Sequence, residues 1–166
     1  MPALVTGKLA PSFSLKTTDG KTVSLKDLLQ HGAVVLAFFK VTCPVCQFAF
    51  PLYERLGRAH KDGKVTFLGI SQNCAAEAKA FAREYGVTFP IAIDHAANHY
   101  AVSNVYGLTN VPTLFYIASN GEIEMSSVGW SKADVDEVNA KLAGLDHLQA
   151  PPLWHKGEDV PAFRAG

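Results

Sequence analysis

The sequence predicts one α/β domain, in which a central mixed β-sheet is covered by helices on both faces. Apolar segments of strand length alternate with longer segments of helical period, which is typical of a sheet with parallel pairings. Two turn signals, Asp19-Gly20 and Asn120-Gly121, join further strand-like segments into hairpins and so add antiparallel pairs. The 166 residues, of which 48% are hydrophobic and 18% charged, suit one globular domain with a full core.

Each predicted element is bounded by a turn residue, a cap or a break in the periodic pattern. The most apolar segment is 33–39, a run rich in Val and Phe that predicts a strand buried on both faces. In chain order the predicted elements are an N-terminal hairpin of strands 13–16 and 22–25, a helical turn over 26–30, strand 33–39, helix 43–60, strand 65–71, helix 74–85, strand 89–94, helix 96–106, strands 113–118 and 122–128, and helix 132–142.

The elements of the second half carry clear boundary signals. The segment 74–85 is rich in Ala, which favours a helix, and Gly86 is suited to end it. Ser131 is a good cap for the last helix. We assign residues 1–145 to the domain. Residues 146–166 have several prolines and no clear period, and are expected to form an irregular tail on the surface, either disordered or packed through Trp154.

The charge balance argues against two classes of partner. The chain has 15 Lys and Arg against 15 Asp and Glu, a net charge of +0. Nucleic acid or an anionic membrane surface would require a basic patch, so we expect neither as a partner. The first eight residues lack the basic start and apolar block of a signal peptide, and no run of about 18 apolar residues follows. If Met1 is the natural start, the expected location is the cytoplasm.

A C-x-x-C motif, Cys43-Pro44-Val45-Cys46, stands where the strand 33–39 meets the next helix. The first cysteine then falls at a helix N-terminus, where free N–H groups and the helix dipole favour a thiolate. Pro44 suits the first helical turn because it has no N–H to leave unpaired. A zinc site would require a second Cys/His pair, and the only other cysteine is Cys74. We therefore favour a redox dithiol over a metal site or a structural disulfide.

The strand–CPVC–helix unit, with Asn-Val-Pro-Thr-Leu-Phe-Tyr at 110–116, resembles the thioredoxin superfamily. The segments 7–15 and 85–90 are similar to its AhpC/TSA and TlpA/ResA-like branch of thiol-disulfide oxidoreductases, and the resemblance covers about residues 7–143. It implies a thioredoxin-like fold and an enzyme that exchanges a dithiol with disulfides. The motifs are specific for the superfamily and much less specific for one activity within it.

The resemblance also implies the redox chemistry. Cys43 would attack a substrate disulfide as a thiolate, and Cys46 would resolve the mixed disulfide by closing a bond to Cys43. The redox-active disulfide between Cys43 and Cys46 would carry the electrons, so no cofactor and no metal is expected. The expected partners are a disulfide-bearing protein or a low-molecular-weight thiol substrate, and a reductant of the thioredoxin or glutathione type.

Pro112 resembles the cis-proline of the superfamily, which lies opposite the active-site cysteines. The resemblance implies that Val111 before it pairs with the substrate backbone. Thr42, Pro44 and Val45 flank the two cysteines and are predicted to contact the substrate as well.

Two departures separate this chain from thioredoxins themselves. Thr42 stands where they have a Trp, and Ala37 stands where they have a buried acid. Peroxiredoxins use a Pro-x-x-x-Thr-x-x-Cys loop, which matches the sequence in neither cysteine register. A thiol peroxidase with an antioxidant role is therefore the weaker alternative. A non-catalytic module that holds a metal at Cys43 and Cys46 is the second.

Cys74 and two histidines leave smaller questions open. Cys74 is a candidate third redox thiol because it stands near a helix start, but free cysteine is also among the most buried residue types. His95 and His99 have the spacing of one helix face beside Asp94, but without a third separated ligand they are weak evidence for a metal.

Overall fold

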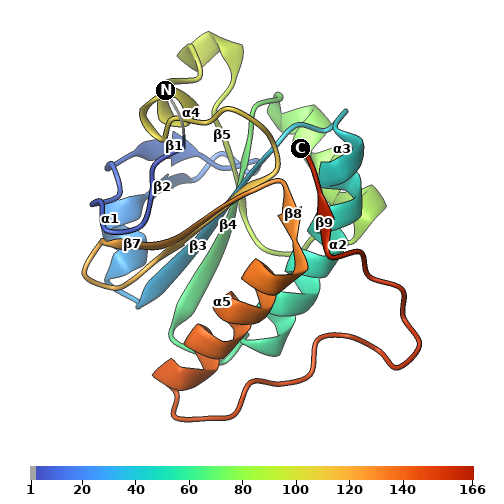
Figure 1. Cartoon of the computed structure of the whole chain (residues 1–166). Coiled ribbons are helices and arrows are strands. Elements are labelled where there is room, and N and C mark those ends of the chain that lie inside the picture. The colour runs from blue at the N-terminus through green and yellow to red at the C-terminus, as the bar shows by residue number, and fades with distance from the viewer. Residues whose placement is uncertain (1–2) are drawn as a thin grey trace.

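Five strands form the central sheet of the computed structural model, which describes residues 3–166 (Figure 1). They lie in the order β5-β4-β3-β6-β7, with β3 parallel to β4 and β4 parallel to β5, while β6 is antiparallel to both β3 and β7. The mixed sheet is thus confirmed. The strands are β3 (Ala33–Phe39), β4 (Val65–Ser71), β5 (Ile91–Ile93), β6 (Thr113–Ile117) and β7 (Ile123–Val128).

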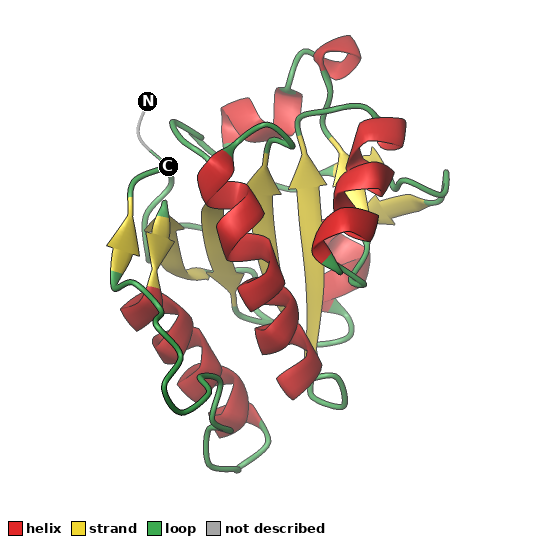
Figure 2. Ribbon diagram, turned by 90° about the vertical axis from the view of Figure 1, so that its right-hand side faces the viewer, coloured by secondary structure: helices red, strands yellow, loops and turns green. Residues whose placement is uncertain are grey.

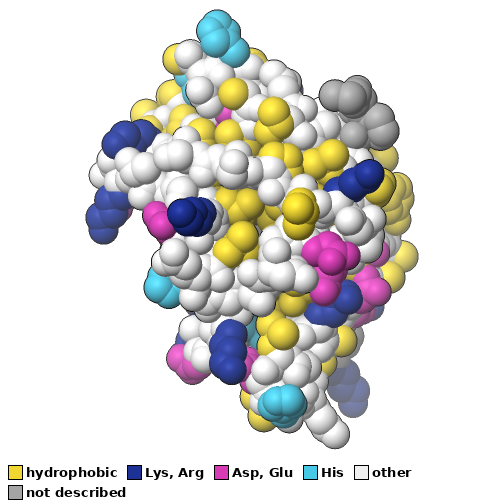
Figure 3. Space-filling model, turned by 90° about the vertical axis from the view of Figure 1, so that its left-hand side faces the viewer, with side chains coloured by type: hydrophobic (Ala, Val, Ile, Leu, Met, Phe, Trp, Pro, Cys, Tyr) yellow, Lys and Arg dark blue, Asp and Glu magenta, His cyan; other side chains and the backbone are white. Residues whose placement is uncertain are grey.

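Helices cover both faces of this sheet, as predicted (Figure 2). One face packs against α2 (Pro44–Ala59), α3 (Ala75–Tyr85) and α5 (Lys132–Leu145). The other packs against α1 (Leu25–Leu29), α4 (Ala101–Val105) and the predicted N-terminal hairpin, whose strands are β1 (Ser14–Lys16) and β2 (Thr22–Ser24). On this side of the molecule, hydrophobic side chains lie among charged groups of both signs (Figure 3).

The central strand β3 is buried along its whole length, as the apolar run predicts. Alternate side chains serve the two layers: Val35, Ala37 and Phe39 pack under α2, while Leu36 and Phe38 pack under the opposite layer. Because both of its faces are covered, β3 holds the chain in a fixed position at the start of α2.

Within residues 3–166, no helix combines the length and apolar content needed to cross a bilayer.

The single helix predicted over 96–106 is wrong. A 3₁₀ turn, η1 (Ala96–Asn98), is followed by His99 and Tyr100 at φ values of 53° and 50°, and only then by α4. The cause is the buried carboxylate of Asp94, which accepts hydrogen bonds from the Ser103 N–H and hydroxyl at 2.6 and 2.7 Å and so fixes a new helix start. His95 and His99 therefore do not share one helix face.

Glu54 is a charged side chain of α2 that is buried in the structure. Its carboxylate accepts hydrogen bonds from the Thr88 N–H at 2.7 Å and hydroxyl at 2.6 Å, and from Arg58 at 2.7 Å. Burial acts to raise the pKa of Glu54, but these bonds and one from the Phe89 N–H outweigh it, so the pKa lies below the usual 4.5. Glu54 thus ties α2 to the segment before β5.

We expect this bond network to make stability depend on pH. The pKa of Glu54 is lower in the folded state than in the unfolded state. The ionised side chain therefore adds to the free energy of unfolding above the unfolded-state pKa, and this stabilisation is lost as pH falls through the folded-state pKa. The urea midpoint of the native protein should therefore drop between about pH 5 and pH 3, and Glu54→Gln should flatten that drop. The matched control is Glu137→Gln on the exposed face of α5. Equal pH profiles for the two variants would contradict this role.

The segment after α5 has little regular structure (Figure 1), but side chains along it pack on the domain. Leu153 is buried in the core beside α2 and α5. Of the two alternatives for Trp154, packing is the one the structure shows: its indole N–H donates to Asp136 at 2.8 Å, and its ring lies edge-on to Trp130. These contacts hold the middle of the tail against α5.

An ion pair and a short strand fix the rest of the tail. Arg55 of α2 donates to both carboxylate oxygens of Glu158, at 2.7 and 2.9 Å, and lowers the pKa of that carboxyl to about 2. The tail then turns upward to β9 (Phe163–Arg164), which pairs antiparallel with β8 (Trp130–Ser131). The end of the chain therefore returns to the end of the molecule where α2 begins (Figure 1).

Candidate active site

The Cys43 thiol lies at the junction of β3 and α2, as the sequence predicts. Cys43 is the N-cap of α2 and Pro44 occupies the first turn. The Cys43 sulfur accepts a hydrogen bond from the Cys46 N–H at 3.3 Å. This N–H is one of the unpaired donors of the helix start, so a negative charge on the sulfur is stabilised by both a hydrogen bond and the helix dipole.

Cys46 lies one turn further along α2 and is completely buried. Burial raises the pKa of the Cys46 thiol, and the neighbouring Cys43 adds to the rise, while the backbone and the charge of Lys40 oppose it. The half-buried Cys43 is therefore open to a substrate, whereas Cys46 is shielded beneath it. This asymmetry suits Cys43 as the attacking sulfur and Cys46 as the resolving one, an assignment that stays a prediction.

The loop before β6 faces the dithiol. The Val111–Pro112 peptide bond is cis, as the resemblance implies. The Cys43 thiol donates to the Val111 carbonyl oxygen at 3.4 Å, across 68 positions of sequence. The structure thus brings together three residues that the sequence analysis places in one site: Cys43, Val111 and Pro112.

The other predicted contact residues differ in their exposure. Thr42 and Pro44 are exposed on either side of Cys43, where an incoming substrate would touch them. Val45 is only half-buried and packs against the core cluster. Their roles in substrate binding remain predictions.

Two polar side chains that the sequence analysis missed hold the loop before Cys43. Asn73 accepts a hydrogen bond from the Val41 N–H at 3.0 Å, and the Gln47 side chain donates to the Val41 carbonyl at 2.9 Å. Asn73 could have been found from the sequence. It follows β4, and the carboxyl ends of parallel neighbours such as β3 and β4 meet at one edge of the sheet.

Cys74 lies outside the site that Cys43, Cys46 and the Val111–Pro112 loop form. It is the half-buried N-cap of α3, and its thiol donates to the Glu77 carboxylate at 3.4 Å. No hydrogen bond joins it to Cys43 or Cys46 among the described residues. A redox role for Cys74 remains a prediction.

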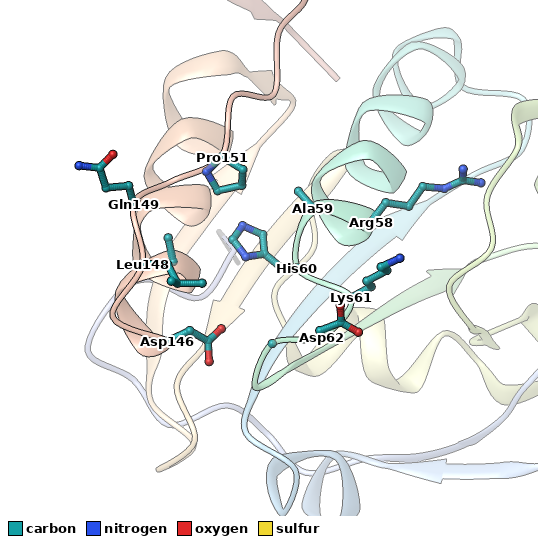
Figure 4. A pocket seen from close by; sticks show the side chains of 11 residues that line it. Arg58, Ala59, His60, Lys61, Asp62, Asp146, Leu148, Gln149 and Pro151 are labelled. Atoms are coloured by element: carbon teal, nitrogen blue, oxygen red, sulfur yellow. The ribbon is translucent and has the colours of Figure 1, made fainter.

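A cavity of about 480 Å³ lies at the opposite end of α2 from the cysteines (Figure 4). Its wall includes His60, whose buried ring meets the Asn139 side chain at 2.6 Å, and Leu148 and Pro151 of the tail. The helix between the two ends has 16 residues, about 24 Å of length, so this cavity takes no part in chemistry at Cys43.

Between residues 3 and 166, no three His, Cys, Asp or Glu side chains gather as a metal site would require. The fold and the adjacent dithiol define a thioredoxin-like thiol-disulfide oxidoreductase.

Comparisons with known proteins agree with this class. The model of the AhpC/TSA family matches residues 6–126, and the chain belongs to that family. The thiol-disulfide oxidoreductase ResA of Halalkalibacterium halodurans is 31% identical over 133 residues, which cover 79% of this chain and 73% of the relative. The thioredoxin-like protein YneN of Bacillus subtilis is 32% identical over 127 residues, which cover 74% and 71% of the two chains.

Solved structures show the same fold. A putative thiol:disulfide interchange protein DsbE from Chlorobium tepidum superposes with a TM-score of 0.75 at 24% identity, over 86% of this chain and 99% of that one. The DsbF structure from MTB has a TM-score of 0.69 at 26% identity, again over 86% and 99%. The thioredoxin-like fold is thereby confirmed.

Proposed function

We propose that the protein transfers electrons between its Cys43–Cys46 dithiol and disulfides of proteins or small thiols, with Cys43 as the nucleophile. The observation that carries this assignment is the pairing of an accessible sulfur at the start of α2 with a buried one directly beneath it. No organic cofactor or metal is needed, because the cysteines themselves carry the two electrons.

The exchange proceeds in two displacements. The Cys43 thiolate attacks one sulfur of the substrate disulfide, a mixed disulfide forms, and the other substrate sulfur leaves as a thiolate that takes up a proton. Cys46 then loses its proton and attacks the Cys43 sulfur, which closes the Cys43–Cys46 disulfide and releases the second substrate thiol. A reductant of the thioredoxin or glutathione type returns the dithiol by the same steps in reverse.

Lys40 supports the second displacement. Its backbone and its ammonium charge both act to lower the pKa of Cys46, against the burial that raises it. The buried acid that thioredoxins place here is absent, because Ala37 fills that position in the core beneath α2. The Lys40 side chain itself is exposed.

The direction of electron flow is tested by the reduction potential. We propose a cytoplasmic protein that reduces disulfides, which requires a Cys43–Cys46 potential at or below about −200 mV, within the range of cytosolic reductants. Equilibration of the protein with glutathione redox buffers gives this value. A potential near about −120 mV, typical of a strong oxidant, would overturn the reductive direction and leave the exchange chemistry intact.

A further inference from the structure

Within the described part of the chain, the backbone groups of Val111 have no backbone partner and could pair with an extended chain. Among residues 3–166, no hydrogen bond uses the Val111 N–H, and its carbonyl oxygen accepts only the Cys43 thiol. A residue before proline is held in an extended conformation. An extended edge with unpaired backbone groups is a template for a further strand. A polypeptide bound at Val111 would thus place its disulfide beside the Cys43 sulfur.

Residues 163–166, which we call the end segment, already lie against this edge. The Asn110 side chain donates to the Gly166 carbonyl at 3.2 Å, and a side chain at Gly166 would collide with the Val111 carbonyl oxygen. On the other side the end segment touches Gly129, where an added Cβ would meet the Arg164 carbonyl oxygen at 2.7 Å. The end segment therefore occupies the space beside Val111 that an extended substrate would need.

The end segment lies on the surface of the domain and is not buried in it. Upstream, the Pro161 carbonyl accepts the Trp130 indole N–H at 2.8 Å and the Ala162 carbonyl accepts the Lys132 N–H at 3.0 Å. Beyond them, all four residues of the end segment are exposed. They are held by the two-residue pairing of β9 with β8, by the Asn110 bond to Gly166, and by the Arg164 guanidinium, 4.2 Å from the centre of the Phe48 ring. Such a segment opens at little cost in free energy.

We propose that the end segment is a specificity gate: an extended polypeptide must displace it from Val111 to reach Cys43, whereas a small disulfide need not. The proposal rests on the proposed disulfide exchange at Cys43. It makes Arg164 and Gly166 determinants of substrate choice. Arg164 fastens the end segment to Phe48 of α2, and Gly166, which has no side chain, lets the end segment come close to Val111.

The test compares two substrates on the 166-residue chain: oxidised glutathione, and an unstructured peptide with one internal disulfide. Arg164→Ala removes the contact with Phe48, and Gly166→Ala pushes the end segment off Val111. Each should raise the second-order rate constant for the peptide by about tenfold, the gain expected when an open state populated at about a tenth becomes dominant. The rate constant for oxidised glutathione should stay within about twofold.

Matched controls are Arg83→Ala at an exposed position of α3, and Gly144→Ala in α5, where an added Cβ meets open space. Both should leave the ratio of the two rate constants unchanged. An unchanged ratio in Arg164→Ala and Gly166→Ala, or a lower peptide rate, would overturn the gate. Failure of the native protein to react with either disulfide would instead overturn the exchange chemistry itself. A rate constant for oxidised glutathione that stays within about twofold of native shows that both variants are folded, so the ratio then reports on the gate alone.

Discussion

Cys43→Ser should lose disulfide exchange almost completely. The hydroxyl that replaces the thiol stays protonated at neutral pH and cannot form the mixed disulfide, so the rate constant for substrate reduction should fall by at least about 10³-fold. The buried Cys46 cannot take over, because it is shielded beneath Cys43 and burial raises its pKa. The measurement is the rate of reduction of a protein disulfide by the pre-reduced protein.

Cys74→Ser is the matched control for this loss. It changes the same atom in a cysteine whose thiol bonds Glu77 and not the dithiol, so the rate should stay within about twofold of native. If the rate instead fell in Cys74→Ser and stayed near native in Cys43→Ser, the active site would lie at Cys74, at the start of α3.

Cys46→Ser should change the outcome of the reaction and not its first step. Cys43 still attacks, but nothing displaces the substrate from its sulfur, so the mixed disulfide accumulates to about one equivalent per chain. Intact-mass spectrometry after mixing with a disulfide-bearing peptide would show the added peptide, and digestion would place it on Cys43. Catalytic turnover near the native rate would show that another thiol resolves the intermediate.

The sequence predicted the central strand and the dithiol better than it predicted the segment after Asp94 and the C-terminal tail. The strand over 33–39 and the dithiol after it depend on local signals: an uninterrupted apolar run, a helix start and a proline that suits it. The approach of Val111 to Cys43 spans 68 positions. Only the resemblance to a known family predicted it, because no periodicity or composition joins the two segments.

Features that depend on tertiary contacts were not predictable in this way. The break at His99 and Tyr100 is imposed by the buried Asp94 carboxylate, which overrides the helical propensity of the segment. Glu54 has the pattern of a surface residue until the Thr88 segment folds over it. The tail has no period, and its path is set by single contacts to distant side chains.

The most direct test of the account is stopped-flow oxidation of the fully reduced protein, by a model protein disulfide and separately by hydrogen peroxide. The account predicts a fast reaction with the disulfide that Cys43→Ser abolishes, and a sluggish reaction with peroxide. Faster consumption of peroxide than of the disulfide would contradict it and would make the protein a thiol peroxidase. The cysteine whose replacement stopped that reaction would then be the true active site.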